Sequence, residues 1–243
     1  MKRILVTGAT SGIGECLVKR LSLQGLEVIA CGRNQQKLAE LAILENVSTV
    51  VFDVTDEQQC LSSLASQKAD VYVLNAGVCE YVDVGQFEAQ MFERVFAANF
   101  FGVINCFAAI LPNLQSGDQV VIVDSLARLM PFTKSQAYGA SKAALHYFCK
   151  SMEVDLAERG IVMQSVSPGF VATPLTAKND FAMPMQISVE QAVEKLIRGI
   201  HKKSASIYFP TLFSLILRTA SRLPTALQVA LSKAMTPKQQ DKH

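Results

Sequence analysis

The chain has 243 residues, of which 50% are hydrophobic and 18% are charged. That length allows one domain with a sizeable core, and that composition excludes a disordered chain. The formal net charge of +2 gives no reason to expect a nucleic acid or another acidic polymer as partner. The charge is uneven, however, because residues 201–243 carry a net of +6 and residues 1–200 a net of −4.

Short runs rich in β-branched residues alternate with segments of helical periodicity along most of the chain. In chain order, strands are predicted at 3–7, 26–31, 49–53, 70–75, 119–124, 161–167 and 205–209, and helices at 13–24, 34–43, 56–66, 87–113, 137–159 and 188–202. The strands are nearly continuously apolar, which is typical of a parallel sheet covered on both faces. We therefore expect a doubly wound α/β fold with a seven-stranded parallel sheet, whose ligand crevice lies at the carboxyl ends of the strands.

Residues 1–209 are expected to form a single domain, since the sequence contains no internal repeat and no low-complexity linker. The first apolar run stops at Thr7-Gly8, so it predicts a strand and not a secretion signal. The apolar stretch from Phe96 to Leu111 is too short to cross a bilayer, so it predicts a buried helix. Six widely separated cysteines, with no metal-binding spacing, are expected to be reduced thiols of a cytoplasmic protein that binds no metal.

The first predicted strand runs directly into the glycine-rich turn 7–14 and then into a helix. Gly8, Gly12 and Gly14 permit a tight turn, close approach of a pyrophosphate to the backbone, and tight packing of helix on strand. The free amides at the start of the helix suit phosphate groups, and we assign Ser11 and Ile13 to the same cofactor-binding turn. A tight turn that binds no ligand is the alternative.

The ends of the second and third strands indicate which cofactor binds. NAD-preferring enzymes place a carboxylate after the second strand, but here Gly32 is followed by Arg33, whose guanidinium suits a 2′-phosphate. We therefore predict NADP(H) in preference to NAD(H), with a solvated surface arginine as the alternative. After the third strand, Asp53 is predicted to accept a hydrogen bond from the adenine amino group. The alternative is that Asp53 or Thr55 caps the next helix.

Tyr138 and Lys142 lie one helical turn apart, so that the phenol and the ammonium share one helix face. A nearby ammonium is expected to lower the pKa of Tyr138, and the pair would then supply a proton to an alkoxide. The pair alone is common on helix surfaces. Ser125 at the end of the fifth strand, and Asn99 within an apolar helix, make a catalytic site the stronger interpretation.

In these motifs and their order, the chain resembles the short-chain dehydrogenase/reductase family, in its single-domain subtype, from residue 2 to about 209. The matching motifs are the turn at 7–14, Asp53-Val54, Asn75-Ala76-Gly77, Asn99, Ser125, Tyr138 with Lys142, and Pro168-Gly169-Phe170-Val171-Ala172-Thr173. Each motif is modest by itself, but the full set at matching spacings is highly specific. The resemblance implies a Rossmann fold and a reaction between a carbonyl and an alcohol.

The resemblance also implies a role for each matching residue. Tyr138 would be the general acid in reduction, or the base in oxidation, and Ser125 would orient the substrate carbonyl. Lys142 would lower the pKa of Tyr138 and bind the nicotinamide ribose, while Asn99 would hold a water that links Lys142 to solvent. Further cofactor contacts would come from Val54, Asn75, Ala76, Gly77, Pro168, Val171 and Thr173.

Two residues depart from the family pattern. Asp124 stands before Ser125, where a small polar residue is usual, and strand geometry directs its side chain away from Ser125. Arg128 replaces a common glycine and is expected to face solvent, with an anionic substrate group as the alternative partner. His146, four residues after Lys142, is expected to pack within its helix and to take no part in the reaction.

Substrate choice in such enzymes comes from the segment between the sixth and seventh strands, here residues 174–203. This lid is short and includes Phe181-Ala182-Met183-Pro184-Met185, which suits an apolar substrate, although packing of the lid explains it equally well.

Residues 210–243 form a predicted helical extension with apolar residues at helical spacing on both sides of Pro224. Arg218, Arg222 and Lys233 lie among these apolar residues. The extension is expected to cover the lid or contact a second subunit; the alternatives are an anionic membrane surface and a loose tail. Residues 237–243 are expected to be disordered.

The favoured function is an NADP(H)-dependent oxidoreductase that interconverts a carbonyl and an alcohol on a small to medium, apolar substrate. A non-catalytic NADP-binding regulatory protein and a membrane-surface scaffold are the alternatives. Neither alternative requires the intact set of Ser125, Tyr138 and Lys142. The family commonly forms dimers or tetramers through its two long helices, here 87–113 and 137–159, so the resemblance implies a homodimer or homotetramer.

Overall fold

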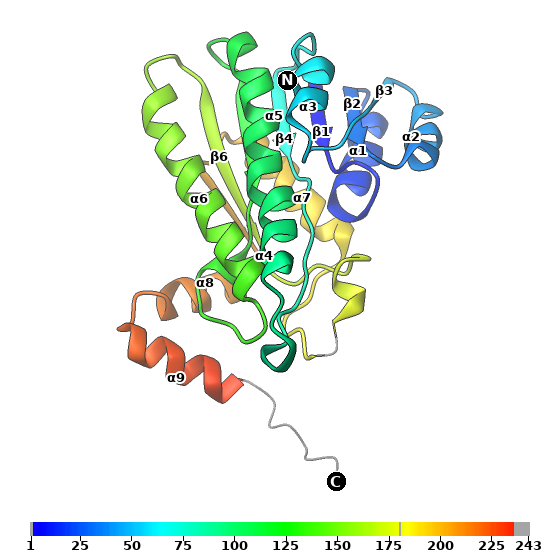
Figure 1. Ribbon diagram of the computed structural model, residues 1–243. Helices are drawn as coiled ribbons and strands as arrows, with labels where there is room; N and C mark the ends of the chain where they lie inside the picture. The colour runs from blue at the N-terminus through cyan, green and yellow to red at the C-terminus, as the bar shows by residue number, and fades with distance from the viewer. Residues whose placement is uncertain (1, 180, 236–243) are drawn as a thin grey trace.

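The computed structural model describes residues 2–179 and 181–235. In this part of the chain, seven strands form one parallel sheet in the order β3-β2-β1-β4-β5-β6-β7, with helices on both faces (Figure 1). The strands are β1 (Arg3–Thr7), β2 (Glu27–Gly32), β3 (Val47–Val51), β4 (Val71–Leu74), β5 (Gln119–Val123), β6 (Val162–Pro168) and β7 (Ser206–Phe209). The helices are α1 (Gly12–Leu23), α2 (Gln35–Ala42), α3 (Glu57–Leu64), α4 (Ala89–Phe96), α5 (Gly102–Ile110), α6 (Gln136–Leu156), α7 (Val189–His201), α8 (Thr211–Ala220) and α9 (Thr225–Met235). The doubly wound, seven-stranded α/β fold is confirmed.

The predicted strands and helices are all present, with changes at their ends. The third strand lies two residues earlier than predicted, because its pairing with β2 begins at Val47, opposite Val28. The fifth strand ends at Val123, so Asp124 lies just beyond it. The helix predicted at 87–113 begins at Ala89 and is interrupted by a π-turn at Ala97–Phe101.

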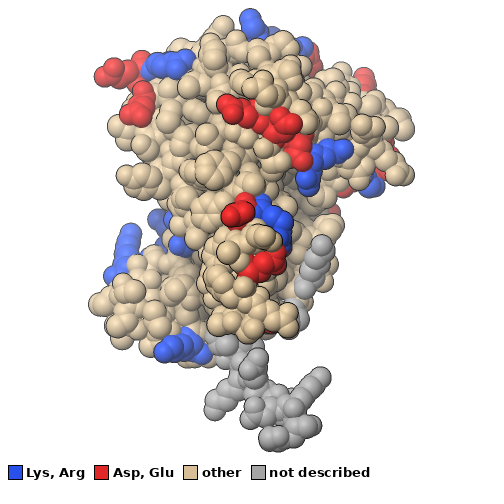
Figure 2. Space-filling view, viewed as in Figure 1, with Lys and Arg blue, Asp and Glu red and all other residues tan. Residues whose placement is uncertain are grey.

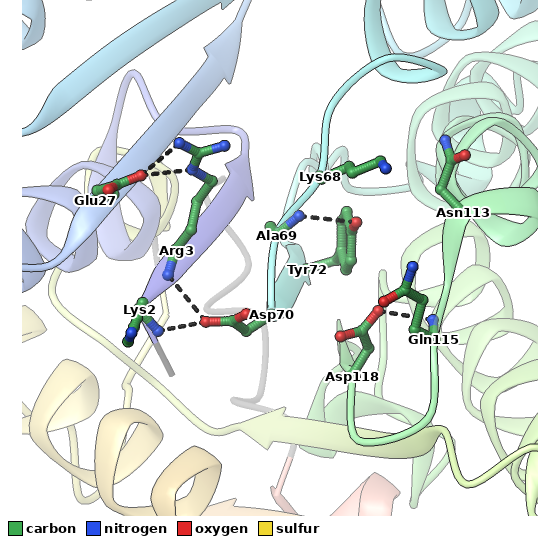
Figure 3. Close-up of a pocket in the computed structure, with 10 residues that line it drawn as sticks. All are labelled: Lys2, Arg3, Glu27, Lys68, Ala69, Asp70, Tyr72, Asn113, Gln115 and Asp118. Atoms are coloured by element: carbon green, nitrogen blue, oxygen red, sulfur yellow. Dashed lines mark hydrogen bonds and ion pairs between the residues drawn. The ribbon is translucent and has the colours of Figure 1, made fainter.

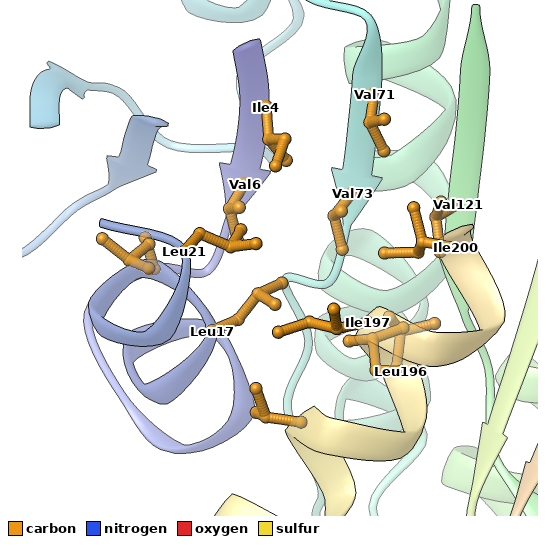
Figure 4. Packing of buried hydrophobic residues seen from close by; sticks show 14 of the residues in the cluster. Ile4, Val6, Leu17, Leu21, Val71, Val73, Val121, Leu196, Ile197 and Ile200 are labelled. Carbon is orange, nitrogen blue, oxygen red and sulfur yellow. The ribbon is translucent and has the colours of Figure 1, made fainter. Parts of the chain in front are cut away.

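Side chains of the central strands alternate between two hydrophobic layers. Ile4 and Val6 point to the face covered by α1, α2 and α7, while Leu5 points to the face covered by α3, α5 and α6. Figure 4 shows the first layer, where Leu17 of α1 and Ile197 of α7 meet over the strands. Because both faces are buried, neither face of a strand needs polar residues, which explains the continuous apolar runs in the sequence.

The helical segment from Ala89 to Asn113 is long enough and apolar enough to cross a membrane, judged by length and composition alone. Val103, Cys106 and Ile110 of this segment are buried against the sheet and the neighbouring helices. Its inner face is therefore part of the core, as predicted.

The strand order places the ends of β1 and β4 side by side at the point where the chain changes direction across the sheet. There, α1 and α7 pack side by side on one face, and α5 and α6 cover the other (Figure 1). α7 is fixed at its start by a capping box, in which Ser188 and Gln191 each accept a hydrogen bond from the other's backbone N–H. Such a cap contributes about 1 kcal/mol.

The extension after β7 consists of α8 and α9, with Pro224 between them, as the sequence predicts. Leu217 of α8 is buried against Leu126 and Met130, which follow β5. α8 therefore lies at the carboxyl ends of the strands, where Figure 1 shows it at the foot of the sheet. The tail that was expected to be disordered, residues 237–243, lies outside the described residues.

Candidate active site

The glycine-rich turn after β1 forms an open cradle at the start of α1. Gly8 and Gly12 have φ angles of +64° and +53°, in the left-handed region that favours glycine. A Cβ atom on Gly14 would lie 2.2 Å from the carbonyl oxygen of Gly8. Ser11 is the exposed N-cap of α1, and Ile13 packs against the core beneath it. Free amides and a side-chain-free backbone at a helix start fit the pyrophosphate of a dinucleotide.

Hydrogen bonds fasten the end of β4 to this turn. The Thr7 hydroxyl oxygen accepts from the backbone N–H groups of Asn75 and Ala76 at 3.0 and 3.2 Å. In return, Nδ2 of Asn75 donates to the carbonyls of Thr7 and Gly8 at 3.2 and 3.3 Å. A Cβ atom on Gly77 would lie 3.4 Å from Nζ of Lys142. The predicted residues 75–77 therefore lie between the glycine-rich turn and Lys142.

At the ends of β2 and β3, Arg33 and Asp53 form an ion pair of 3.1 Å between Nη1 and Oδ2. Burial opposes ionisation of Asp53, but hydrogen bonds from Thr55 and Arg33 outweigh it and lower the pKa of this carboxyl. The cap of α3 is Asp56, whose Oδ1 accepts from the backbone N–H of Gln59 at 3.0 Å. The alternative that Asp53 or Thr55 caps this helix is therefore wrong. Arg33 and Asp53 both lie at the carboxyl ends of the strands.

Three catalytic candidates converge where β5 ends and α6 begins. Nζ of Lys142 lies 5.9 Å from the centre of the Tyr138 ring. Lys142 is 4% exposed, and its ammonium donates to the carbonyl of Val123 at 2.9 Å. Ser125 lies close enough to Tyr138 for its hydroxyl to lower the pKa of the phenol, and the Ser125 oxygen accepts from the backbone N–H of Ala127 at 3.1 Å. The structure thus brings Ser125, Tyr138 and Lys142 together beside the cradle.

Burial dominates the ionisation of this pair. It raises the pKa of Tyr138 well above the usual value; Cys79 and Asp124 add to the rise, and the hydrogen bond with Ser125 opposes it. Burial also lowers the pKa of Lys142 to about 8, against the opposing effect of Asp124. The pKa of Tyr138 is therefore raised in this structure and not lowered as expected, because burial removes water from around the phenolate. At neutral pH, Tyr138 is a phenol that can donate a proton.

Asn99 lies in the π-turn of the long helix and is fully buried. Its Oδ1 accepts from the backbone N–H of Val78 at 2.7 Å, and its Nδ2 donates to the carbonyl of Val78 at 2.9 Å and to Oγ of Ser141 at 3.0 Å. These bonds satisfy the polar group that burial would otherwise penalise. The side chain fastens the segment after β4 to α6, and its link to water stays a prediction.

The predicted residues after β6 close over the cofactor end. β6 ends at Pro168, and Val171 is 3% exposed and pairs with Ile187 as an isolated parallel bridge. A Cβ atom on Gly12 would lie 3.3 Å from the Cβ of Thr173. Thr173 therefore borders the glycine cradle, and residues 168–173 lie between it and the substrate side. Val54, the remaining cofactor candidate, packs against Gly102 at the start of α5.

Two residues that the sequence analysis passed over line the same region. Cys79 lies close enough to Tyr138 to raise its pKa, and burial raises the pKa of the thiol itself. The Tyr81 hydroxyl donates to Asn179 at 2.5 Å, and the Tyr81 ring packs edge-on against Phe181 at 5.5 Å between centroids. Both follow the Asn75-Ala76-Gly77 motif within four residues, and that proximity is the signal that would have identified them.

A buried charge cluster lies behind Ser125. Oδ2 of Asp124 is 2.8 Å from Nδ1 of His146 and 3.3 Å from Nε of Arg128. The side chain of Arg128 is only 9% exposed, and its Nη2 also reaches Oγ of Ser167 at 3.4 Å. The expectation that Arg128 faces solvent is wrong, because the Asp124 carboxylate holds the guanidinium inside the fold. His146 packs within the molecule as expected, and it does so as a partner of Asp124.

A hollow of ≈ 290 Å³ lies at the amino ends of the strands, away from these residues (Figure 3). There, the Asp70 carboxylate accepts from the backbone N–H groups of Lys2 and Arg3, and the Tyr72 hydroxyl accepts from Ala69. These polar groups bind one another at the amino ends of the strands, whereas doubly wound sheets bind ligands at the carboxyl ends. The hollow is therefore not the active site.

Comparison with known proteins agrees with this geometry. The family model for short chain dehydrogenases matches residues 2–184. An uncharacterized oxidoreductase of Staphylococcus epidermidis is 31% identical over 212 residues, which cover 84% of this chain and 92% of the relative. One of Myxococcus xanthus is 32% identical, covering 95% of this chain and 96% of the relative.

Among solved structures, a short chain dehydrogenase of Burkholderia cenocepacia in complex with NADP has a TM-score of 0.85 at 24% identity. The similarity covers 98% of this chain and 100% of that one. The chain belongs to the short-chain dehydrogenase/reductase family. It is accordingly an oxidoreductase with the Rossmann fold of that family.

Proposed function

We propose that this protein interconverts a carbonyl and an alcohol with NADP(H) as cofactor, and that Tyr138 supplies the proton. The observation that supports this most strongly is the convergence of Ser125, Tyr138 and Lys142 next to the glycine cradle of α1. A protein that only sensed the cofactor would have no use for a buried ammonium held against a phenol, since burial of Lys142 costs stability.

The chain's own residues position the substrate oxygen and move the proton. The nicotinamide, when bound, supplies or accepts the hydride. The Ser125 hydroxyl and the Tyr138 phenol, which lie close together, both donate to the oxygen of a carbonyl placed between them. Tyr138, neutral because of its raised pKa, gives its proton to that oxygen as negative charge develops there. Lys142 would bind the hydroxyl groups of the nicotinamide ribose.

The substrate side favours an apolar molecule of small to medium size. The rings of Tyr81 and Phe181 meet edge-on, and Phe181 and Phe170 lie 6.1 Å apart between centroids. These rings form an aromatic wall between the segment after β4 and the predicted lid. Apolar walls with few polar groups are typical of sites that take small apolar ligands.

An assay of the purified chain tests the function directly. NADPH oxidation is followed with a panel of aldehydes, ketones and quinones, for the natural chain and for Tyr138→Phe. We expect at least one carbonyl to be reduced at a rate that depends on Tyr138. If the protein binds NADPH but reduces none of the panel, the regulatory alternative is favoured.

The preference for NADP(H) rests on Arg33. Its side chain is 67% exposed at the end of β2, where a 2′-phosphate would take the place of Asp53 as its partner or bind beside it. The Burkholderia cenocepacia relative was solved with NADP.

We expect Arg33→Ala to raise KM for NADPH by about tenfold to a hundredfold, since charged hydrogen bonds contribute about 1.5–3 kcal/mol. KM for NADH should change by less than about twofold, because NADH has no 2′-phosphate. Initial-rate kinetics with both cofactors measure the two effects. Equal effects on both would remove the basis for the NADP preference.

A homo-oligomer is supported by the outer face of the two long helices. Phe101, Tyr147 and Val154 are exposed by 56%, 79% and 74%, and Tyr147 and Val154 lie two turns apart on one side of α6. Such a stripe of exposed apolar residues is typical of a protein interface. Light scattering of the full chain should give the mass of a dimer or a tetramer, and a monomer mass would contradict this.

The six free cysteines support a reducing, cytoplasmic location.

A further inference from the structure

Helix α8 is apolar on both of its sides. On its inner side, Phe213 stacks on Phe170 with 5.8 Å between centroids, and Leu217 is 3% exposed. On its outer side, Leu212 and Leu215 are exposed by 60% and 58%. Exposed leucines opposite the buried side of a surface helix mark a second contact surface. The inner side of α8 packs against residues of this chain, whereas the leucines on its outer side are exposed to solvent.

Helix α9 follows α8 in the chain and carries further exposed apolar residues. Leu227, Leu231 and Met235 follow one another at four-residue steps, which puts them on one side of the helix, and they are exposed by 51%, 42% and 54%. We define the C-terminal apolar surface as Leu212, Leu215, Ile216, Leu227, Leu231 and Met235. Exposed large apolar residues concentrated on two successive helices mark an interaction site.

The charge around this surface has one sign. The last acidic residue before it is Glu194, and none follows up to residue 235. Arg218 lies on α8, Lys233 lies on α9, and Arg222 lies in the turn between the two helices. Figure 2 shows Lys and Arg, and no Asp or Glu, on the visible part of this region. The surface is therefore apolar with a basic margin.

We propose that α8 and α9 dock this protein on an anionic lipid bilayer, with the C-terminal apolar surface inserted between the headgroups. Apolar residues beside Lys and Arg on short helices are the composition of interfacial membrane helices, and the basic residues complement anionic lipid. A second copy of the chain is the less fitting occupant. A two-fold symmetric contact would bring two copies of this basic region together, and residues 195–235 hold no acidic residue that could pair with Arg222 or Lys233 of the other copy.

Docking in this way would orient the active site. Phe213 and Leu217 pack on Phe170 and Leu126, which border the site, so α8 lies between the substrate region and the outer surface. The carboxyl ends of the strands would therefore face the bilayer. The docking itself depends on no step of the proposed reaction.

Vesicle flotation of the full-length protein tests the proposal. The vesicles are phosphatidylcholine alone, or phosphatidylcholine with about a third phosphatidylserine. We expect binding to the anionic vesicles that weakens with salt, and much weaker binding to the neutral ones. Arg222→Gln with Lys233→Gln should weaken anionic binding by roughly fivefold for each residue replaced. Arg20→Gln, an exposed arginine on α1, is the matched control and should bind like the natural chain.

Removal of the apolar part is the second arm. Leu215→Glu with Ile216→Glu should abolish flotation, while Leu23→Glu, at a residue 82% exposed on α1, should leave it unchanged. Circular dichroism and melting temperature confirm that each variant is folded. The proposal is overturned if the natural chain does not bind the anionic vesicles. It is also overturned if Leu215→Glu with Ile216→Glu leaves flotation intact but dissociates an oligomer in light scattering, which would make a second copy the occupant.

Discussion

Replacing Tyr138 by phenylalanine should lower kcat for carbonyl reduction by about a thousandfold, within the range that general acid catalysis contributes. The substitution removes one hydroxyl and keeps the ring, so the packing around it changes little. It removes the neutral O–H that the raised pKa of Tyr138 provides at pH 7. Steady-state kinetics give kcat, and fluorescence titration with NADPH should give a Kd within about twofold of the natural value, because the change lies outside the glycine cradle.

Two other tyrosines serve as controls for this result. Tyr147→Phe lies on the same helix at a residue 79% exposed and should be without effect. Tyr81→Phe removes a hydroxyl that is bonded to Asn179, and it should change KM for the carbonyl more than kcat. If Tyr81→Phe stops the reaction and Tyr138→Phe does not, the proton donor has been assigned to the wrong phenol.

Replacing Asp124 by asparagine should destabilise the protein by about 3–5 kcal/mol, because it leaves the buried guanidinium of Arg128 without its carboxylate. The pair is buried on both sides, since the side chains of Asp124 and Arg128 are 0% and 9% exposed. Urea unfolding at constant pH measures the change in free energy. Glu40→Gln removes a carboxylate from the exposed ion pair with Lys37 and should cost less than about 1 kcal/mol.

A second substitution separates the lost pairing from other causes. Asp124→Asn with Arg128→Met removes both charges and should recover most of the lost stability, as replacement of a buried pair by apolar residues often does. A double variant as unstable as the single one would show that the buried guanidinium is not the cause.

The single substitution Asp124→Asn should also shift the pH dependence of catalysis. Lys142 loses its proton as the pH rises through about 8, so kcat/KM should fall above that pH. The Asp124 carboxylate raises the pKa of Lys142, so its removal should shift the falling limb to lower pH. An unshifted limb would mean that Asp124 acts on stability alone.

The fold was largely predictable because a parallel sheet is buried on both faces. Its strands appear in the sequence as apolar runs, which can be located without knowing which strands pair. Only the third strand lies two residues away from its predicted position, because its pairing with β2 begins at Val47. The predicted residues Ser125, Tyr138 and Lys142 lie close together because Ser125 follows the end of β5, and Tyr138 and Lys142 lie in the first two turns of α6. Order along the chain is enough to place such residues when the topology is known.

What the sequence could not predict depends on contacts between distant segments. Arg128 looked solvent-facing because a loop arginine usually is, and only the partner at Asp124 explains its burial. The pKa of Tyr138 was predicted from its ammonium neighbour, whereas the depth of burial decides it. Cys79 belongs to no motif and lies in the site because the neighbouring Val78 is hydrogen-bonded to Asn99.

The strand order has a consequence for the synthesis of the chain. After β3, each new strand pairs with a free edge of the sheet already formed: β4 on β1, then β5 on β4, β6 on β5 and β7 on β6. The sheet can therefore assemble in the order in which the ribosome releases it, with no strand inserted later between two others. The two helices with the exposed apolar residues emerge last, when the sheet that supports them is already complete.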